Sequence, residues 1–139
     1  MAGYSGTPLA NKLGIKPGCK VAVLGGPRDF RATLGQVLEG VEFRSGLRGA
    51  KPCDVIVFFV DRKQALEQRF AEAAERLTPA GGLWIAWPKK ASGVATDLNE
   101  NLIRDIGLTA GLVDNKVCAI DETWSGLRFV RRLKDRPNK

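Results

Sequence analysis

Histidine is absent from this chain, and cysteine is scarce. The three cysteines, Cys19, Cys53 and Cys118, lie far apart and form no C-x-x-C pair. These features exclude zinc sites of the usual Cys/His type, Ser-His-Asp and Cys-His catalysis, and a histidine general base. Each cysteine falls in or beside an expected strand, where a reduced thiol packs as a small apolar side chain. We therefore predict no metal site and no catalytic cysteine.

Long apolar runs are also missing. No stretch approaches the roughly 20 residues that a membrane-spanning helix needs, and the first residues, MAGYSGTPLANK, lack the apolar core of a signal peptide. We expect a cytoplasmic protein that does not associate with a membrane. The 139 residues, of which 44% are hydrophobic and 27% charged, fit a single domain, residues 1–139, with one core.

Positive charge is in excess. A net charge of +7 favours an anionic partner, such as nucleic acid, a phosphorylated metabolite or an acidic protein surface. Much of this charge lies in residues 131–139, RRLKDRPNK, which hold three Arg and two Lys against one Asp. This basic tail is read either as a solvated, frayed terminus or as a contact for nucleic acid.

Short apolar segments alternate with amphipathic ones along the chain. The apolar segments predict strands at residues 20–24, 41–44, 54–60, 82–87, 116–120 and 127–132. Helical spacing predicts helices over residues 8–13, 30–38, 62–77 and 98–107. Thr7, Asp61 and Asp97 are the expected caps of the first, third and fourth helices, and residues 78–81, TPAG, are the expected end of the third.

This order of elements predicts an α/β fold. Strands that alternate with helices form a mostly parallel sheet with right-handed crossovers, while residues 121–126 connect the last two strands as an antiparallel hairpin. We therefore expect a short, Rossmann-like three-layer domain with a C-terminal antiparallel strand.

The stretch over residues 82–97, GLWIAWPKKASGVATD, joins an apolar strand to a basic loop. Residues 83–87 show no polar alternation, which indicates a central strand covered on both faces. Pro88 ends the ladder, so the loop leaves the sheet at its carboxyl end, where ligands bind in open α/β sheets. We predict an anion site on this loop, assisted by the start of the next helix and formed by Lys89, Lys90, Ser92, Gly93 and Thr96. The alternative is that the lysines are solvated and that Thr96 or Asp97 only caps the helix.

Other connections are expected at the same edge. They are residues 25–28, 61–62 and 121–126, which would bring Gly25 and Gly26 near the basic loop. Trp87 and Trp124 are candidates for an aromatic wall beside a flat ligand, or for cover over the core.

Chemically active side chains are few at this edge. Trp84 points to the opposite side of its strand from Trp87 and is assigned to packing. Asp121 and Glu122 are the nearest carboxylates, but adjacent residues in an extended chain point apart and are no natural catalytic pair. We identify no nucleophile and assign no catalytic residue.

Two resemblances add to this reading. The segments KLGIKPGCKVAVLGGP and GGLWIAWP, with the final hairpin, resemble the class I S-adenosylmethionine-dependent methyltransferase fold. This resemblance implies a D/E-x-G-x-G cofactor loop after the first strand. Residues 24–28, LGGPR, keep two glycines but lack the acidic residue and the final glycine. Arg44 stands near the place where the family has an acidic residue for the cofactor ribose.

The second resemblance covers nearly the whole chain. The segments GYSGTPLANKLGIKPG, WPKKASGVATDL and GLVDNKVCAIDETWSGLRFVRR closely resemble a family of small bacterial proteins of unknown function. This resemblance implies a bacterial protein, and it brings no activity with it.

Three functions follow from these observations. The leading hypothesis is a non-catalytic binding module that holds an anionic small molecule or a regulatory partner at the basic loop edge. Its candidate ligand residues are Gly25, Gly26, Lys89, Lys90, Ser92, Gly93, Thr96 and Trp124. The alternatives are a divergent methyltransferase that binds S-adenosylmethionine at the Gly25–Gly26 loop, and a basic protein associated with nucleic acid.

Overall fold

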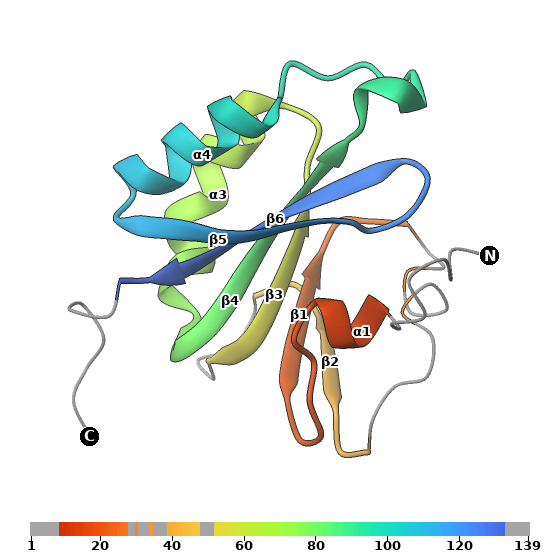
Figure 1. Cartoon of the computed structure of the whole chain (residues 1–139). Coiled ribbons are helices and arrows are strands. Elements are labelled where there is room, and N and C mark those ends of the chain that lie inside the picture. The colour runs from red at the N-terminus through yellow and green to blue at the C-terminus, as the bar shows by residue number, and fades with distance from the viewer. Residues whose placement is uncertain (1–8, 28–29, 31–33, 35–38, 48–51, 133–139) are drawn as a thin grey trace.

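The computed structural model describes residues 9–27, 30, 34, 39–47 and 52–132, which form one six-stranded sheet with helices on both faces (Figure 1). The strands are β1 (Lys20–Leu24), β2 (Glu42–Ser45), β3 (Cys53–Phe59), β4 (Leu77–Pro88), β5 (Leu112–Ala119) and β6 (Trp124–Arg131). The helices are α1 (Leu9–Lys12), α3 (Lys63–Glu75) and α4 (Glu100–Thr109), with a short 3₁₀ turn η2 (Lys90–Ser92). The predicted Rossmann-like α/β fold is confirmed.

The sheet has the order β2-β1-β3-β4-β6-β5. The four strands from β2 to β4 are parallel, while β6 lies antiparallel between β4 and β5. Because β2 lies on one side of β1 and β3 on the other, the strand order reverses between β1 and β3. In doubly wound sheets this reversal creates a crevice at the carboxyl ends of the two strands. We call this place the switch point.

Two apolar cores cover the two faces of the sheet. The first core packs α3 and α4 against side chains such as Ile56, Ile85 and Phe129. The second core packs α1, Phe30 and Leu34 against the other face. Trp84 belongs to the second core, and its indole Nε1 donates a hydrogen bond to the carbonyl oxygen of Leu13 at 3.0 Å. The predicted packing role of Trp84 is confirmed.

The start of β4 differs from the prediction. Residues 78–81 were expected to end a helix, but α3 ends at Glu75 and the strand begins at Leu77. Leu77 pairs with Cys53 and Gly82 pairs with Val55, so the intervening residues form an irregularity in the ladder. Proline is tolerated at such a bulge because its missing N–H leaves no ladder bond unmade. The Pro-Gly signal therefore marked a bulge within a strand.

The helix caps also differ from the prediction. Arg62, not Asp61, is the N-cap residue of α3, and its side chain makes no capping bond. Asp97 provides that bond instead, because its Oδ1 accepts a hydrogen bond from the backbone N–H of Lys63 at 2.7 Å. Helix α4 is capped by Asn99, whose side chain accepts from the N–H of Leu102 at 2.9 Å. Local spacing thus misassigned two caps.

Parts of three predictions lie outside the described residues: the Thr7 cap, most of the helix expected over residues 30–38, and residues 133–139 of the basic tail. Arg131 belongs to β6, where its Nη2 donates to the carbonyl oxygens of Ala74 and Leu77, both at 3.0 Å. This residue therefore closes the carboxyl end of α3. In the part of the chain that the structure describes, no helix is long and apolar enough to cross a membrane.

Candidate functional site

The connections that follow the parallel strands meet at one edge of the sheet, as predicted. At this edge Pro88 pairs with Trp124, and the N–H of Lys89 donates to the carbonyl oxygen of Thr123 at 2.7 Å. The backbone of Gly25 lies against Phe59, the last residue of β3. Segments that are distant in the sequence are therefore side by side at the carboxyl ends of β1, β3 and β4.

The switch point is filled by aromatic side chains of the protein itself. Gly25 and Gly26 have φ angles of 67° and 94°, and a Cβ added to Gly26 would come within 2.6 Å of the Phe59 ring. Phe59 packs edge-on against both Phe30 and Trp124, with ring centroids 5.0 Å apart in each pair. The two glycines therefore allow Phe59 to approach the backbone at the place where a ligand binds in related sheets.

A pocket of about 450 Å³ lies beside this aromatic cluster, between the carboxyl ends of β1 and β2. We call it the β1–β2 pocket. Its lining includes Gly25, Phe43, Arg44, Ser45 and, from α3, Arg69. Two arginines line it, and none of the described lining residues is acidic. This arrangement favours an anion.

Each of these arginines has a carboxylate neighbour outside the pocket lining. Arg44 Nη2 lies 3.3 Å from Glu42 Oε2, and Arg69 Nε lies 3.3 Å from Glu72 Oε1. The Glu42 and Glu72 side chains are 53% and 48% exposed. Because these carboxylates are about half exposed, water screens their attraction to the arginines and the ion pairs contribute little free energy.

The basic loop lines a second pocket of about 520 Å³, which includes Trp87, Lys90, Gly93, Thr96 and Glu100. We call it the loop pocket. Of the predicted site residues, Gly25 lines the β1–β2 pocket, whereas Lys90, Gly93 and Thr96 line the loop pocket. The other four, Gly26, Lys89, Ser92 and Trp124, are in neither lining, so the predicted residues do not form one site.

The backbone of the basic loop is hydrogen-bonded within the protein. The N–H of Ser92 donates to the carbonyl oxygen of Lys89 at 3.0 Å, and the Ser92 hydroxyl donates to the same oxygen at 2.6 Å. The N–H of Gly93 bonds to the oxygen of Lys90, and that of Val94 bonds to Ser92 Oγ. These three N–H groups already have partners within the protein and are not available to an anion.

Thr96 also has structural partners. Its hydroxyl donates to the carbonyl oxygen of Asp61 at 2.7 Å and accepts from the N–H of Leu98 at 3.1 Å. Together with the Asp97 cap, these bonds fasten the end of the loop to the start of α3. A ligand would therefore have to compete with these two backbone groups for the Thr96 hydroxyl.

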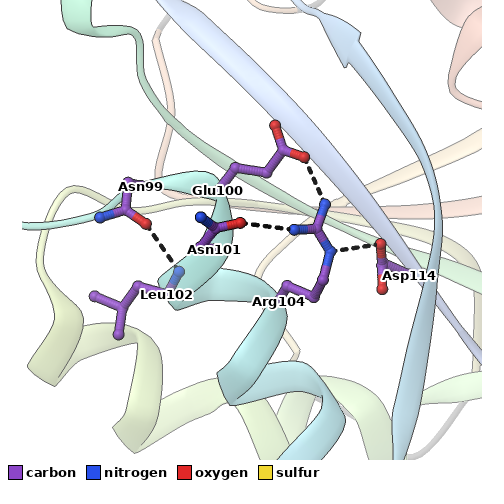
Figure 2. A network of polar contacts seen from close by, with 6 residues as sticks. All are labelled: Asn99, Glu100, Asn101, Leu102, Arg104 and Asp114. Carbon is purple, nitrogen blue, oxygen red and sulfur yellow. Dashed lines mark hydrogen bonds and ion pairs between the residues drawn. The ribbon is translucent and has the colours of Figure 1, made fainter.

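A network around Arg104 anchors the helix that follows the loop (Figure 2). Arg104 Nε donates to Asp114 Oδ2 of β5 at 2.9 Å, and the same guanidinium bonds to Glu100 and Asn101. The hydrogen bond to Asp114 is the largest cause that raises the pKa of Arg104. Glu100, which lines the loop pocket, is therefore already paired with a cation.

The expected aromatic wall does not form. Trp87 is buried in the core beneath α3 and α4, whereas Trp124 packs on the core of the opposite face. Asp121 is equally structural, because its Oδ1 accepts from the N–H groups of Thr123 and Trp124, both at 2.8 Å. This carboxylate closes the hairpin turn and is no evident acid or base.

The cysteines have the properties of packing residues. Burial is the largest cause that raises the pKa of Cys53 and of Cys118, so both thiols stay protonated near neutral pH. Among the described residues, no group of three or more Cys, Asp or Glu side chains is placed to hold a metal ion.

Sequence reasoning missed two residues of this edge. Phe59 reads as an ordinary residue of an apolar strand, and nothing in the pattern indicates that its ring covers the glycine loop. Arg69 is one of several exposed charges on α3, and only the packing of that helix brings it to the β1–β2 pocket. Arg44 was noted from the sequence only because it stands near the place of the acidic residue of the methyltransferase family, and it was not among the predicted site residues. It does line this pocket.

Comparison with solved structures places the fold in the class of methyltransferase-like Rossmann domains. A putative type 11 methyltransferase from Sulfolobus solfataricus matches with a TM-score of 0.63 and 15% identity, over 94% of this chain and 93% of that one. Magnesium protoporphyrin IX methyltransferase from Synechocystis PCC 6803, solved with bound SAH, matches with a TM-score of 0.58 and 13% identity, over 84% and 75%. At such identities the likeness extends to the fold alone.

The sequence itself belongs to a defined family. Residues 10–133 match the family described as protein of unknown function (DUF3052), so the chain is a member of it. A comparison with curated proteins finds no match. The two resemblances stated from the sequence, to a family of unknown function and to the methyltransferase fold, are both confirmed.

Proposed function

We propose that this protein is a binding module that holds an anionic small molecule at the carboxyl edge of its sheet. The observation that carries the proposal is the β1–β2 pocket, which both Arg44 and Arg69 line and whose described lining holds no acidic residue. Arginine suits this task because its planar guanidinium can bind phosphate or carboxylate through two parallel hydrogen bonds.

The basic loop is the second candidate site for the same function. Lys90 lines the loop pocket, but this pocket also includes Glu100. The mixed charge and the internally bonded loop backbone favour the β1–β2 pocket over it. Lys89 and Lys90 stay in the proposal as cations that raise the local concentration of an anion at this edge.

Thermal unfolding with inorganic pyrophosphate tests the proposal. Ionic strength is held constant with KCl, and the full chain is compared with Arg44→Gln, the double variant Lys89→Ala/Lys90→Ala, and Lys16→Gln. The control residue Lys16 is exposed in the turn before β1, at the opposite end of that strand. At a ligand concentration about 100 times the Kd, binding stabilises the folded state by about 2.7 kcal/mol.

We expect pyrophosphate to raise the Tm of the wild type and of the Lys16 variant, and the rise to disappear in Arg44→Gln. Loss of the rise only in the lysine double variant would move the site to the basic loop. The same rise in all four proteins would contradict a specific anion site and indicate general charge screening.

A divergent methyltransferase is the second candidate function, and the positive φ angles of Gly25 and Gly26 after β1 are the observation that favours it. The Phe59 ring against these glycines and the arginine near the expected ribose position oppose it. Calorimetric titration with S-adenosylmethionine separates the two functions. We expect no heat of binding at millimolar cofactor, and a saturable heat of binding to the wild-type chain would favour the enzyme.

The nucleic-acid alternative rests on net charge. It predicts an affinity for nucleic acid that falls steeply with salt. A flat salt response would exclude binding dominated by phosphate contacts.

A further inference from the structure

The β1–β2 pocket has the size and lining of a nucleotide site. Its volume of about 450 Å³ falls within the usual range of small-molecule pockets. Apolar residues such as Leu24 and Pro27 also line it, beside the cations of Arg44 and Arg69. One pocket thus combines the two kinds of surface that a phosphorylated nucleoside needs.

The position of Arg44 indicates which phosphate group of a nucleotide it would contact. In doubly wound sheets, a residue near the carboxyl end of the second strand contacts the ribose of a bound nucleotide. An acidic residue there accepts a hydrogen bond from a 2′-hydroxyl, whereas an arginine accommodates a 2′-phosphate. Arg44 and Ser45 are the last two residues of β2, and they lie in register with Ala22 and Val23 of β1.

We infer that the β1–β2 pocket binds a nucleotide with a phosphomonoester on the 2′ position of its ribose. Arg44 is the principal ligand of this phosphate, and Arg69 supplies a second positive charge. The inference rests on the proposed function, because it names the class of anion that the same pocket holds. A dianionic phosphate would compete with the half-exposed Glu42 carboxylate for Arg44, because hydrogen bonds between arginine and phosphate are charge-assisted and can be bidentate.

Calorimetric titration of the full chain tests this inference with three probes: adenosine 2′-monophosphate, adenosine 5′-monophosphate and adenosine, all at one ionic strength. We expect the 2′-phosphate to bind about tenfold tighter, or more, than the other two, which is the size of effect that one charge-assisted contact gives. Arg44→Gln should abolish this preference, and Arg69→Gln should reduce it. Arg44→Lys, which keeps the charge without the planar fork, should retain part of it.

The control variant Lys16→Gln should keep the full preference for the 2′-phosphate. Circular dichroism and the Tm measured without ligand show whether each variant folds. If Arg44→Gln does not fold, Arg44→Lys replaces it in the test.

The outcomes separate this inference from the proposed function. Equal affinity for the 2′- and 5′-phosphates, with both dependent on Arg44, would overturn the inference and leave the anion site in place. A 2′ preference that survives Arg44→Gln and Arg69→Gln would overturn it by placing the site elsewhere. If no nucleotide binds while pyrophosphate still stabilises the wild type through Arg44, only the inference fails. If neither binds, the proposed function fails as well.

Discussion

Replacement of Phe59 by alanine tests whether the protein fills its own switch point. Phe59 is 6% exposed, and its ring makes T-shaped contacts with the rings of both Phe30 and Trp124. Loss of a buried phenylalanine ring costs about 3–5 kcal/mol. A domain of this size has a free energy of unfolding of about 5–15 kcal/mol. The variant should therefore stay folded in the cold, with a Tm lower by roughly 10–20 °C.

A double-mutant cycle isolates the part of this cost that comes from the aromatic cluster. The cycle combines Phe59→Ala with Trp124→Ala and follows urea unfolding by far-UV circular dichroism, a signal that does not depend on tryptophan. An edge-to-face aromatic pair contributes about 0.5–1.5 kcal/mol beyond the area that it buries. We expect a coupling free energy of this size between the two positions.

The matched control uses Phe58, the neighbouring residue in β3. Phe58 is also 6% exposed but belongs to the core on the other face of the sheet. Phe58→Ala should destabilise the protein to a similar degree and couple with Trp124→Ala by less than about 0.5 kcal/mol. Equal coupling of Trp124 with both phenylalanines would refute the idea of an aromatic cluster at the switch point. Phe59→Leu, which has no ring, replaces the alanine variant if the double variant does not fold.

Two further substitutions test the packing of α4 and the capping of α3. Gly107→Ala would place a Cβ on the ring of Phe129, which is fully buried, so an overpacking cost of about 2–3 kcal/mol should exceed the gain of about 1 kcal/mol in helix propensity. Urea unfolding should show a net loss of about 1–2 kcal/mol, and a more stable variant would contradict the packing. Asp97→Ala should cost about 1 kcal/mol because α3 loses its cap, and exchange of the Lys63 amide hydrogen should accelerate. Asp97→Asn should retain most of the stability and most of the protection of the Lys63 amide. Unchanged exchange in the alanine variant would exclude this capping role.

The sheet was predictable because its strands carry strong local signals. The segments around Val21 and Ile56 are apolar on both faces, which is typical of buried parallel strands. The errors arose where tertiary contacts override local rules. Pro79 reads as a helix stop but sits in a bulge of β4. Asp97 reads as the cap of the helix that follows it but caps α3, 34 residues earlier, and no local spacing encodes such a contact.

The site was predictable only in outline. Glycine, lysine and proline patterns indicated which connections lie together at one edge of the sheet, because the carboxyl ends of parallel strands necessarily share one edge. The presence of two separate pockets at that edge was not predictable, since a pocket depends on how side chains from several elements pack together. The contribution of Arg69 depends in turn on how α3 packs against the sheet.

The glycines after β1 illustrate why a loop motif alone does not establish a ligand. A glycine-rich turn at this position usually lets a cofactor approach the backbone. Here the group that approaches Gly25 and Gly26 is Phe59, through its carbonyl oxygen and its ring. Packing therefore requires both glycines whether or not a ligand binds. Their presence does not distinguish a loop that binds a cofactor from a loop that is covered by the Phe59 ring. The proposed anion site therefore rests on Arg44 and Arg69, which line the β1–β2 pocket, and not on the glycines.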